Sequence, residues 1–325
     1  MISRRKLMAL SAASALAPAL AGQSAHAQAW PNRFVRLVVP FPAGGGADAI
    51  ARIIGVRLSE IWGQQVTIEN RGGASGNLAA ENVAHSPPDG YTLFLAGDFQ
   101  AVNVFLHPKL SYDPVADFAP VSLVVQYVNA AALPNSSPAK TVQDFVALAK
   151  SRPLSFASPG LGVSGHLAGV QFMRESGIKL NVIPYRGAAP AIQDLIPGRV
   201  DIFFNNLSPL ISLAEQKQLR VMAVTTLQRS PSMPEVPTFA ESGLPGFDVP
   251  GWYAFFVPAK TPPEIIRKMH ADTAAALAEP AIRKKLEDLG LIVVGSTPEQ
   301  LGQYMKSQMD KWGPIIKEAG LSIKE

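Results

Sequence analysis

The chain repeatedly alternates a short apolar segment, a glycine-rich turn and an amphipathic segment, and this order limits the folds open to it. Residues 34–39 read as a strand that stops at Pro40, and residues 47–62 read as a helix with apolar residues at helical spacing. Further strands at 66–69 and 91–95 flank a helix near 77–85. Strands that alternate with helices through short turns form parallel sheets covered by helices on both faces. The sequence therefore predicts an α/β fold with parallel-rich sheets.

The same alternation continues to the end of the chain and predicts two lobes. Thr141, Thr261 and Thr297 are expected to be helix N-caps, because each is followed three positions later by a side chain that can accept a hydrogen bond. Crossover segments are expected near 125–134 and 246–252. The predicted domains are a first lobe at 28–129 and 250–325 and a second lobe at 130–249. In open α/β sheets a ligand binds at the carboxyl ends of the strands, so we expect it in the cleft.

The first residues have the pattern of an export signal. Arg4, Arg5 and Lys6 precede an Ala- and Leu-rich run that is too short to span a bilayer, and residues 25–27 form a small-x-small cleavage pattern. We expect residues 1–27 to be a signal peptide cleaved after Ala27, which predicts a periplasmic protein. The pair of arginines also fits a twin-arginine signal, so the sequence leaves the export route open.

Composition excludes several functional classes. The chain has no cysteine, which rules out disulfides, a lipoprotein anchor and thiolate metal sites. Three basic residues belong to the predicted signal, so the formal net charge of +4 overstates the charge of the mature chain. No basic stripe or RNA-binding signature follows, and we expect no nucleic-acid partner.

Two glycine-rich turns, at 39–48 and 71–77, each lie between a strand and a helix. Unpaired N–H groups and the positive end of the helix dipole favour an anion at such a position. Glycine lets the backbone approach the anion, and we expect Gly46 to have a positive φ, so that Gly46→Val would abolish binding. The turns predict a carboxylate or phosphate site, although each glycine could instead serve a tight turn alone.

A dinucleotide site is the alternative interpretation of the first turn. Residues 44–49 satisfy G-x-G-x-x-A, and Glu69 ends the next strand where a ribose-binding acid belongs. The alternative function is therefore an exported NAD-dependent oxidoreductase that uses the Gly44–Gly46 turn. Asp48 argues against it, because its charge would lie beside a pyrophosphate.

The sequence contains no convincing catalytic constellation. Residues 162–166 nearly form a nucleophile elbow, but His166 stands where G-x-S-x-G needs glycine. The histidines show no H-x-x-x-H spacing, and the acidic pairs lie on helix faces expected to be solvated. We therefore expect no enzyme, no catalytic residues, no cofactor and no metal.

Many short segments together resemble one known family. The chain resembles the Bug family, the extracytoplasmic receptors of tripartite tricarboxylate transporters, over residues 30–325. The matching segments are 36–48, 69–77, 88–93, 112–121, 184–190, 225–229, 235–238, 243–247 and 261–264. The resemblance implies a two-lobed periplasmic-binding-protein fold with two crossover segments that closes on its ligand. It implies a monomeric receptor, used for transport or sensing, for dicarboxylates, tricarboxylates, aromatic acids or acidic amino acids, with membrane permease subunits as partners.

The resemblance also implies the ligand-binding residues, in loops of both lobes. They are Phe41, Gly44, Gly45, Gly46, Ala47, Asp48, Asp98 and Phe99 in the first lobe, and Ser158, Ser164, His166 and Asn205 in the second. Asn205 stands where the family often has Asp, which removes a partner for a ligand ammonium group. Phe99 stands where small residues are common and could either stack on an aromatic ligand or simply pack in the core. These departures favour a carboxylate without an α-ammonium group, such as an aromatic acid, whereas Asp98 could restore the missing charge.

Overall fold

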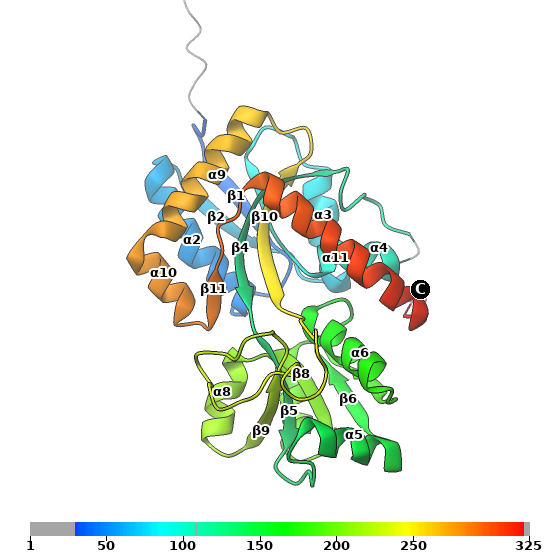
Figure 1. The fold of residues 1–325 in the computed structure, drawn as a ribbon. Helices are drawn as coiled ribbons and strands as arrows, with labels where there is room; N and C mark the ends of the chain where they lie inside the picture. Colours follow the sequence, from blue (N-terminus) through cyan, green and yellow to red (C-terminus); the bar gives the residue numbers. More distant parts are fainter. Residues whose placement is uncertain (1–29, 108, 322–325) are drawn as a thin grey trace, which may run out of the picture. The chain divides into compact units, whose positions relative to one another are not determined.

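A computed structural model describes residues 30–107 and 109–321 (Figure 1). The predicted signal peptide and its cleavage site lie outside these residues. The chain divides into a short N-terminal unit that ends at Asn32 and a compact unit that begins at Arg33. All elements below belong to the second unit.

A six-stranded mixed sheet has the strand order β11-β4-β10-β3-β1-β2. β1 pairs in parallel with β2 and β3, whereas β10 runs antiparallel to β3 and β4, and β11 runs antiparallel to β4. The strands are β1 (Val35–Val39), β2 (Val66–Asn70), β3 (Thr92–Gly97), β4 (Phe118–Tyr127), β10 (Gly251–Pro258) and β11 (Leu291–Val293).

A five-stranded mixed sheet has the order β7-β6-β8-β5-β9. β6 is parallel to β7 and β8, and β5 is antiparallel to β8 and β9. The strands are β5 (Asn129–Pro134), β6 (Ser155–Ser158), β7 (Asn181–Pro184), β8 (Ile202–Asn206) and β9 (Leu219–Val224). The α/β class is confirmed. Both sheets are mixed rather than mainly parallel, because β10 and β11 in the first sheet and β5 in the second run antiparallel to the strands beside them.

Helices cover both faces of the six-stranded sheet, as Figure 1 shows. One group packs beside β1, β2 and β4, and the other packs beside β3, β4 and β10. The first group is α2 (Gly46–Trp62), α9 (Pro263–Ala278) and α10 (Pro280–Glu287). The second is α3 (Asn77–Ala84), α4 (Phe99–Leu106) and α11 (Pro298–Glu318), with the short 3₁₀ turn η1 (Ala74–Gly76) before α3. The five-stranded sheet carries α5 (Val142–Ser151), α6 (Ser164–Ser176), α7 (Ala188–Leu195) and α8 (Ser208–Glu215). None of the described helices combines the length and apolar content needed to cross a membrane.

Two of the three predicted N-caps are confirmed. Thr141 and Thr297 form capping boxes at α5 and α11. The prediction for Thr261 is wrong: Pro262 is the N-cap of α9, and the Thr261 hydroxyl donates to the Pro258 carbonyl, 2.7 Å away. The Thr261 N–H also donates to the Pro258 carbonyl, so the threonine belongs to the turn that follows β10 rather than to the helix cap.

The chain crosses between the sheets at two places. β4 ends at Tyr127 in the first sheet and β5 begins at Asn129 in the second, so Val128 alone separates them. The return path runs from β9 to β10. Asn129 and Thr225 join the two paths, because the side chain of each donates a hydrogen bond to the Val249 carbonyl. The exact residues at which the lobes divide stay a prediction.

Candidate functional site

The first glycine turn folds around its own carboxylate. Asp48, in the first turn of α2, is 4% exposed. Its Oδ2 accepts hydrogen bonds of 2.9 Å from the Arg52 Nε and from the Gly44 N–H. The hydrogen bond from Arg52, with help from Gly44, holds the pKa of Asp48 below its ordinary value. The turn therefore already contains one anion, the Asp48 carboxylate. The Gly44 N–H donates to that carboxylate rather than to a ligand.

The positive φ in this turn belongs to Gly44, not to Gly46. Gly44 has φ +85°, Gly45 is the extended N-cap of α2, and Gly46 opens the helix. The expectation of a positive φ at Gly46 was wrong. The chain turns at Gly44, two residues earlier, and Gly46 enters the helix with ordinary backbone dihedrals. A Cβ at Gly46 would meet no atom within 4 Å. Ala47 is buried behind it.

Phe99 lies in the hydrophobic core. The ring is 1% exposed and makes edge contacts with Phe41, at 6.1 Å between centroids, and with Phe94, at 6.2 Å. Phe41 is only partly buried and packs against the same cluster. Phe41 is thus the more accessible of the two predicted aromatic residues, and a ligand could reach Phe99 only through a local rearrangement.

The second glycine turn has an unusual backbone. Ala74 and Ser75 have positive φ values of 46° and 53°, between two glycines that are also positive. Asn103 of α4 supports this conformation by donating from its Nδ2 to the Ser75 carbonyl at 3.0 Å and to the Asn77 Oδ1 at 2.7 Å. The turn is therefore held from α4.

Ser158 ends β6, and Ser164 and His166 lie in the first turn of α6, on the two sides of the connecting loop; all three are buried. Ser158 Oγ donates to the Gly160 carbonyl at 3.1 Å. The Gly162 N–H donates to the His166 Nδ1 at 3.3 Å. Gly162 also lies close to α4, since a Cβ there would be 2.9 Å from the Asn103 Oδ1. The loop from the second sheet therefore contacts a helix of the first.

His166 is neutral and has one unused donor. Its ring stacks on Phe156, with centroids 6.4 Å apart, and burial lowers the pKa of His166 to about 4. Because Nδ1 accepts a hydrogen bond, the proton of the neutral ring belongs on Nε2. Within the described residues Nε2 is buried and has no hydrogen-bond partner. A buried N–H without an acceptor costs about 1–3 kcal/mol, so an acceptor there would be bound favourably.

The structure joins Asp98 to Ser164 through a tyrosine that the sequence analysis did not select. The Tyr127 hydroxyl lies 3.2 Å from Asp98 Oδ2 and 3.0 Å from Ser164 Oγ, and Ser164 Oγ lies 3.3 Å from Asn129 Oδ1. Burial raises the pKa of Asp98 to about 7. Loops after β3 and β6, from different sheets, therefore meet at Tyr127.

Tyr127 and Asn129 are the functional candidates that sequence reasoning missed. Both are polar, and both belong, with Gln126, to the mainly apolar run that the sequence marked as a crossover. Polar residues inside a crossing strand could have served as the signal. Asn205 of β8 lies opposite Ala130 of β5, and its Nδ2 donates only a long hydrogen bond, of 3.3 Å, to the Asn206 carbonyl. Its side chain is thus only weakly held.

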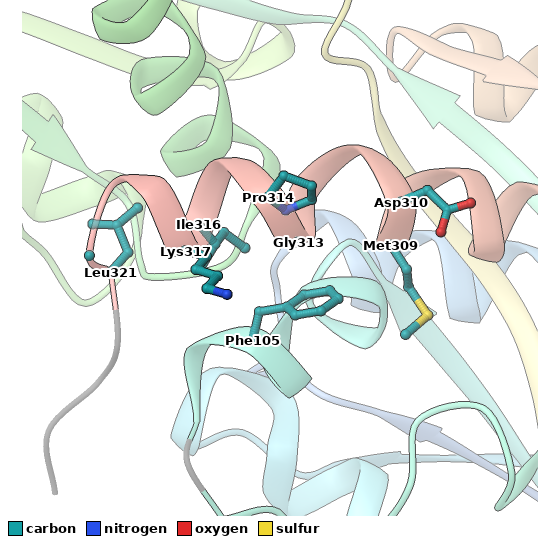
Figure 2. A pocket seen from close by; sticks show the side chains of 9 residues that line it. Phe105, Met309, Asp310, Gly313, Pro314, Ile316, Lys317 and Leu321 are labelled. Carbon is teal, nitrogen blue, oxygen red and sulfur yellow. The ribbon is translucent and has the colours of Figure 1, made fainter.

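One surface pocket lies away from these residues. Figure 2 shows it between Phe105 of α4 and the C-terminal half of α11, with Met309, Asp310 and Lys317 among its lining side chains. None of the predicted site residues lines it. Its walls are mainly apolar and offer no cluster of anion-binding groups. In the described part of the chain, no group of three or more His, Asp or Glu side chains could hold a metal ion.

Comparison with known proteins identifies the family. The model of the tripartite tricarboxylate transporter family receptor matches residues 50–321. Protein BugT of Bordetella pertussis is 32% identical over 302 residues, which cover 92% of this chain and 93% of BugT. The R. palustris protein Rpa4515, solved with adipate, is 36% identical with a TM-score of 0.83, over 90% of this chain and 99% of that one. MatC from Rhodopseudomonas palustris, solved with bound malate, is 31% identical with a TM-score of 0.80, over 88% of this chain and 100% of MatC. This chain therefore belongs to the Bug-type receptors of tripartite tricarboxylate transporters, as its sequence motifs indicated.

Proposed function

We propose that this solute-binding receptor captures a small dicarboxylate without an amino group in the periplasm and does no chemistry on it. The observation that carries the proposal is the adipate in Rpa4515, a protein similar to this chain along nearly its whole length. The malate in MatC supports the same ligand class. The partners would be permease subunits of a tripartite tricarboxylate-type transporter, or a sensing system, and the receptor would act as a monomer.

The described site residues support an anionic ligand. The His166 Nε2–H is a buried donor that lacks an acceptor, and a ligand would reach it through a local rearrangement, as it would Phe99. Gly45 and Gly46 begin a 17-residue helix, whose first N–H groups favour negative charge. Asn205 brings no charge to its strand end. Of the predicted aromatic contacts, only Phe41 is accessible, which favours an aliphatic dicarboxylate over an aromatic acid.

A calorimetric panel tests the ligand class. Adipate, malate and succinate should bind more tightly than glutamate, aspartate, benzoate and the phthalate isomers. A bound dicarboxylate at one hundred times its dissociation constant should raise the free energy of unfolding by about 2.7 kcal/mol, measured by thermal shift. Tighter binding of glutamate or aspartate than of every amine-free acid would contradict the proposal.

Asn205→Asp provides a specificity test. The added carboxylate should weaken adipate binding by charge repulsion and improve binding of glutamate or aspartate, whose ammonium group gains a partner. Asn206→Asp is the matched control, because it adds the same charge one residue away and keeps the acceptor that caps the Ser208 N–H. Equal effects of the two variants would show that Asn205 has no specific role.

The oxidoreductase alternative is tested directly. Titration with NADH should give no saturable change in its fluorescence, and adipate recovered from the protein should be chemically unchanged. Saturable enhancement would favour the dinucleotide site at Gly44–Gly46.

A further inference from the structure

Four polar groups form a continuous chain at the crossover. Asp98 follows β3, Tyr127 ends β4, Asn129 begins β5 and Ser164 begins α6. Their oxygens are separated by 3.2 Å from Asp98 to Tyr127, 3.0 Å from Tyr127 to Ser164, and 3.3 Å from Ser164 to Asn129. All four residues are at least nine-tenths buried. We call these four residues the hinge chain. They join side chains from both sheets, beside the point where the polypeptide crosses from one sheet to the other.

The orientation of the Asn129 amide is set by its other contact. Its Nδ2 donates to the Val249 carbonyl at 3.2 Å, so its Oδ1 faces Ser164 and can only accept. The opposite orientation would place two carbonyl-type oxygens against each other. Ser164 must therefore donate its single hydroxyl proton to Asn129 if that contact is a hydrogen bond.

Counting protons along the hinge chain leaves one missing. Ser164 uses its proton toward Asn129, so the contact between Tyr127 and Ser164 takes the tyrosine proton. The Tyr127 hydroxyl is also the donor for Asp98 Oδ2 and cannot serve both neighbours with its one proton, whereas a protonated Asp98 completes all three contacts. An ionised Asp98 would draw the tyrosine proton to itself and leave one of the other contacts without a proton.

The surroundings of Asp98 offer no cation to hold it ionised. The titratable groups that face it are Tyr127 of β4, Tyr253 of β10 and Tyr304 of α11. Tyr253 also stacks on Tyr127, with centroids 5.5 Å apart. Hydroxyl and N–H groups of Tyr127, Ser164 and Asp98 itself are the groups that favour its charged form, and burial outweighs them and raises the pKa of Asp98 to about 7. Among the described residues, no Lys, Arg or His interacts with its carboxyl group.

We propose that closure of this receptor on its ligand takes up one proton at Asp98, which completes the hinge chain between the two lobes. This inference rests on the proposed function, since it couples the proton to binding of a carboxylate. When the lobes separate, Ser164 leaves Tyr127 and water reaches Asp98, whose carboxyl group then loses its proton. The protein thus binds an anion together with a proton.

The direction of the pH effect follows from linkage. Asp98 has a pKa of about 7 in this form and an ordinary value of 3.8 when exposed. Closure is therefore favoured most at low pH. Ligand affinity should fall by up to about tenfold per pH unit as the pH rises from about 4 to about 7, and should level off above that.

Calorimetry of adipate in pairs of buffers with different ionisation enthalpies measures the proton directly. The experiment compares pH 6.5 with pH 8.5, where both adipate carboxylates are ionised. We expect uptake of a large fraction of a proton per adipate at pH 6.5 and much less at pH 8.5. Asp98→Asn should abolish the uptake and make the dissociation constant independent of pH, because its amide donates to Tyr127 without titrating. Asp288→Asn, at an exposed aspartate in an ion pair with Lys284, should leave the uptake unchanged.

The outcomes separate this inference from the proposed function. Binding of adipate without proton uptake in the wild-type protein would overturn the inference and leave the receptor function intact. If no carboxylate in the panel binds, the proposed ligand class is wrong, and the hinge chain is judged from unfolding of the ligand-free protein. There Asp98 is open to water, so the stability of Asp98→Asn relative to wild type should not change from pH 5 to pH 8. A difference that grows with pH would overturn the inference, because Asp98 would then hold its proton without closure.

Discussion

Gly44 and Gly46, both in the first glycine turn, have different structural roles. Gly44 has the left-handed conformation and gives its N–H to Asp48, whereas Gly46 opens α2 with open space around its Cα. The two glycines are only two positions apart, so the pattern alone could not separate a turn residue from a residue that leaves room for an anion.

Substitution of each glycine by alanine should distinguish the two roles. Gly44→Ala should lower the free energy of unfolding by about 1 kcal/mol, because a side chain is strained at positive φ. Gly46→Ala should not reduce stability, since alanine favours the helix, but should weaken adipate binding at least tenfold by occupying the space of the anion. Denaturant unfolding and calorimetry measure the two effects. Unchanged affinity in Gly46→Ala would show that the turn is structural only.

At the scale of secondary structure, the strands that meet at the crossover depend on one close approach. β10 begins at Gly251, which pairs with Tyr127 of β4. A Cβ at Gly251 would lie 2.0 Å from the Tyr127 Cζ. Only glycine at this position lets the tyrosine ring lie against the strand with its hydroxyl between Asp98 and Ser164.

Gly251→Ala should therefore disrupt the crossover. Overpacking of a buried contact typically costs about 1–3 kcal/mol, and displacement of the ring should also weaken adipate binding. Gly302→Ala is the control, because this residue lies within α11 with no atom near its missing Cβ. The control should gain up to about 1 kcal/mol from helix propensity. Chemical denaturation compares the two variants, and equal stability would contradict the predicted clash.

At the scale of the whole molecule, two buried titratable groups affect stability in opposite directions. Burial lowers the pKa of His166 from 6.5 to about 4 and raises that of Asp98 from 3.8 to about 7. As the pH falls from 7 to 4, His166 is protonated in the unfolded protein but stays neutral in the folded protein, and this destabilises the fold. Over the same range Asp98 is protonated in the folded protein but stays ionised in the unfolded protein, and this stabilises the fold. The two effects largely cancel in the wild-type protein.

Variants of these two residues should reveal the cancellation. Relative to wild type, His166→Gln should gain up to about 3 kcal/mol of stability as the pH falls from 6.5 to 4. Asp98→Asn should instead lose stability relative to wild type over that range. Urea titrations at several pH values, with saturating adipate so that the folded protein is closed over Asp98, measure both slopes. Parallel slopes for the two variants would mean that at least one of these side chains is accessible to water in the folded protein.

The alternation of strands and helices, the two capping boxes and the family were readable from the sequence, because they depend on neighbours within a few residues or on whole segments. Local patterns also marked the glycine turns and the crossover regions. The sequence could not show that Phe99 packs in the core beside Phe41, or that Gly44 rather than Gly46 has the positive φ, since the first depends on distant strands and the second on how the turn closes on Asp48. The hinge chain was hidden for the same reason. Asp98, Tyr127 and Ser164 are far apart in the chain, and only the crossing of strands between two sheets brings an aspartic acid, a tyrosine and a serine close enough to share protons.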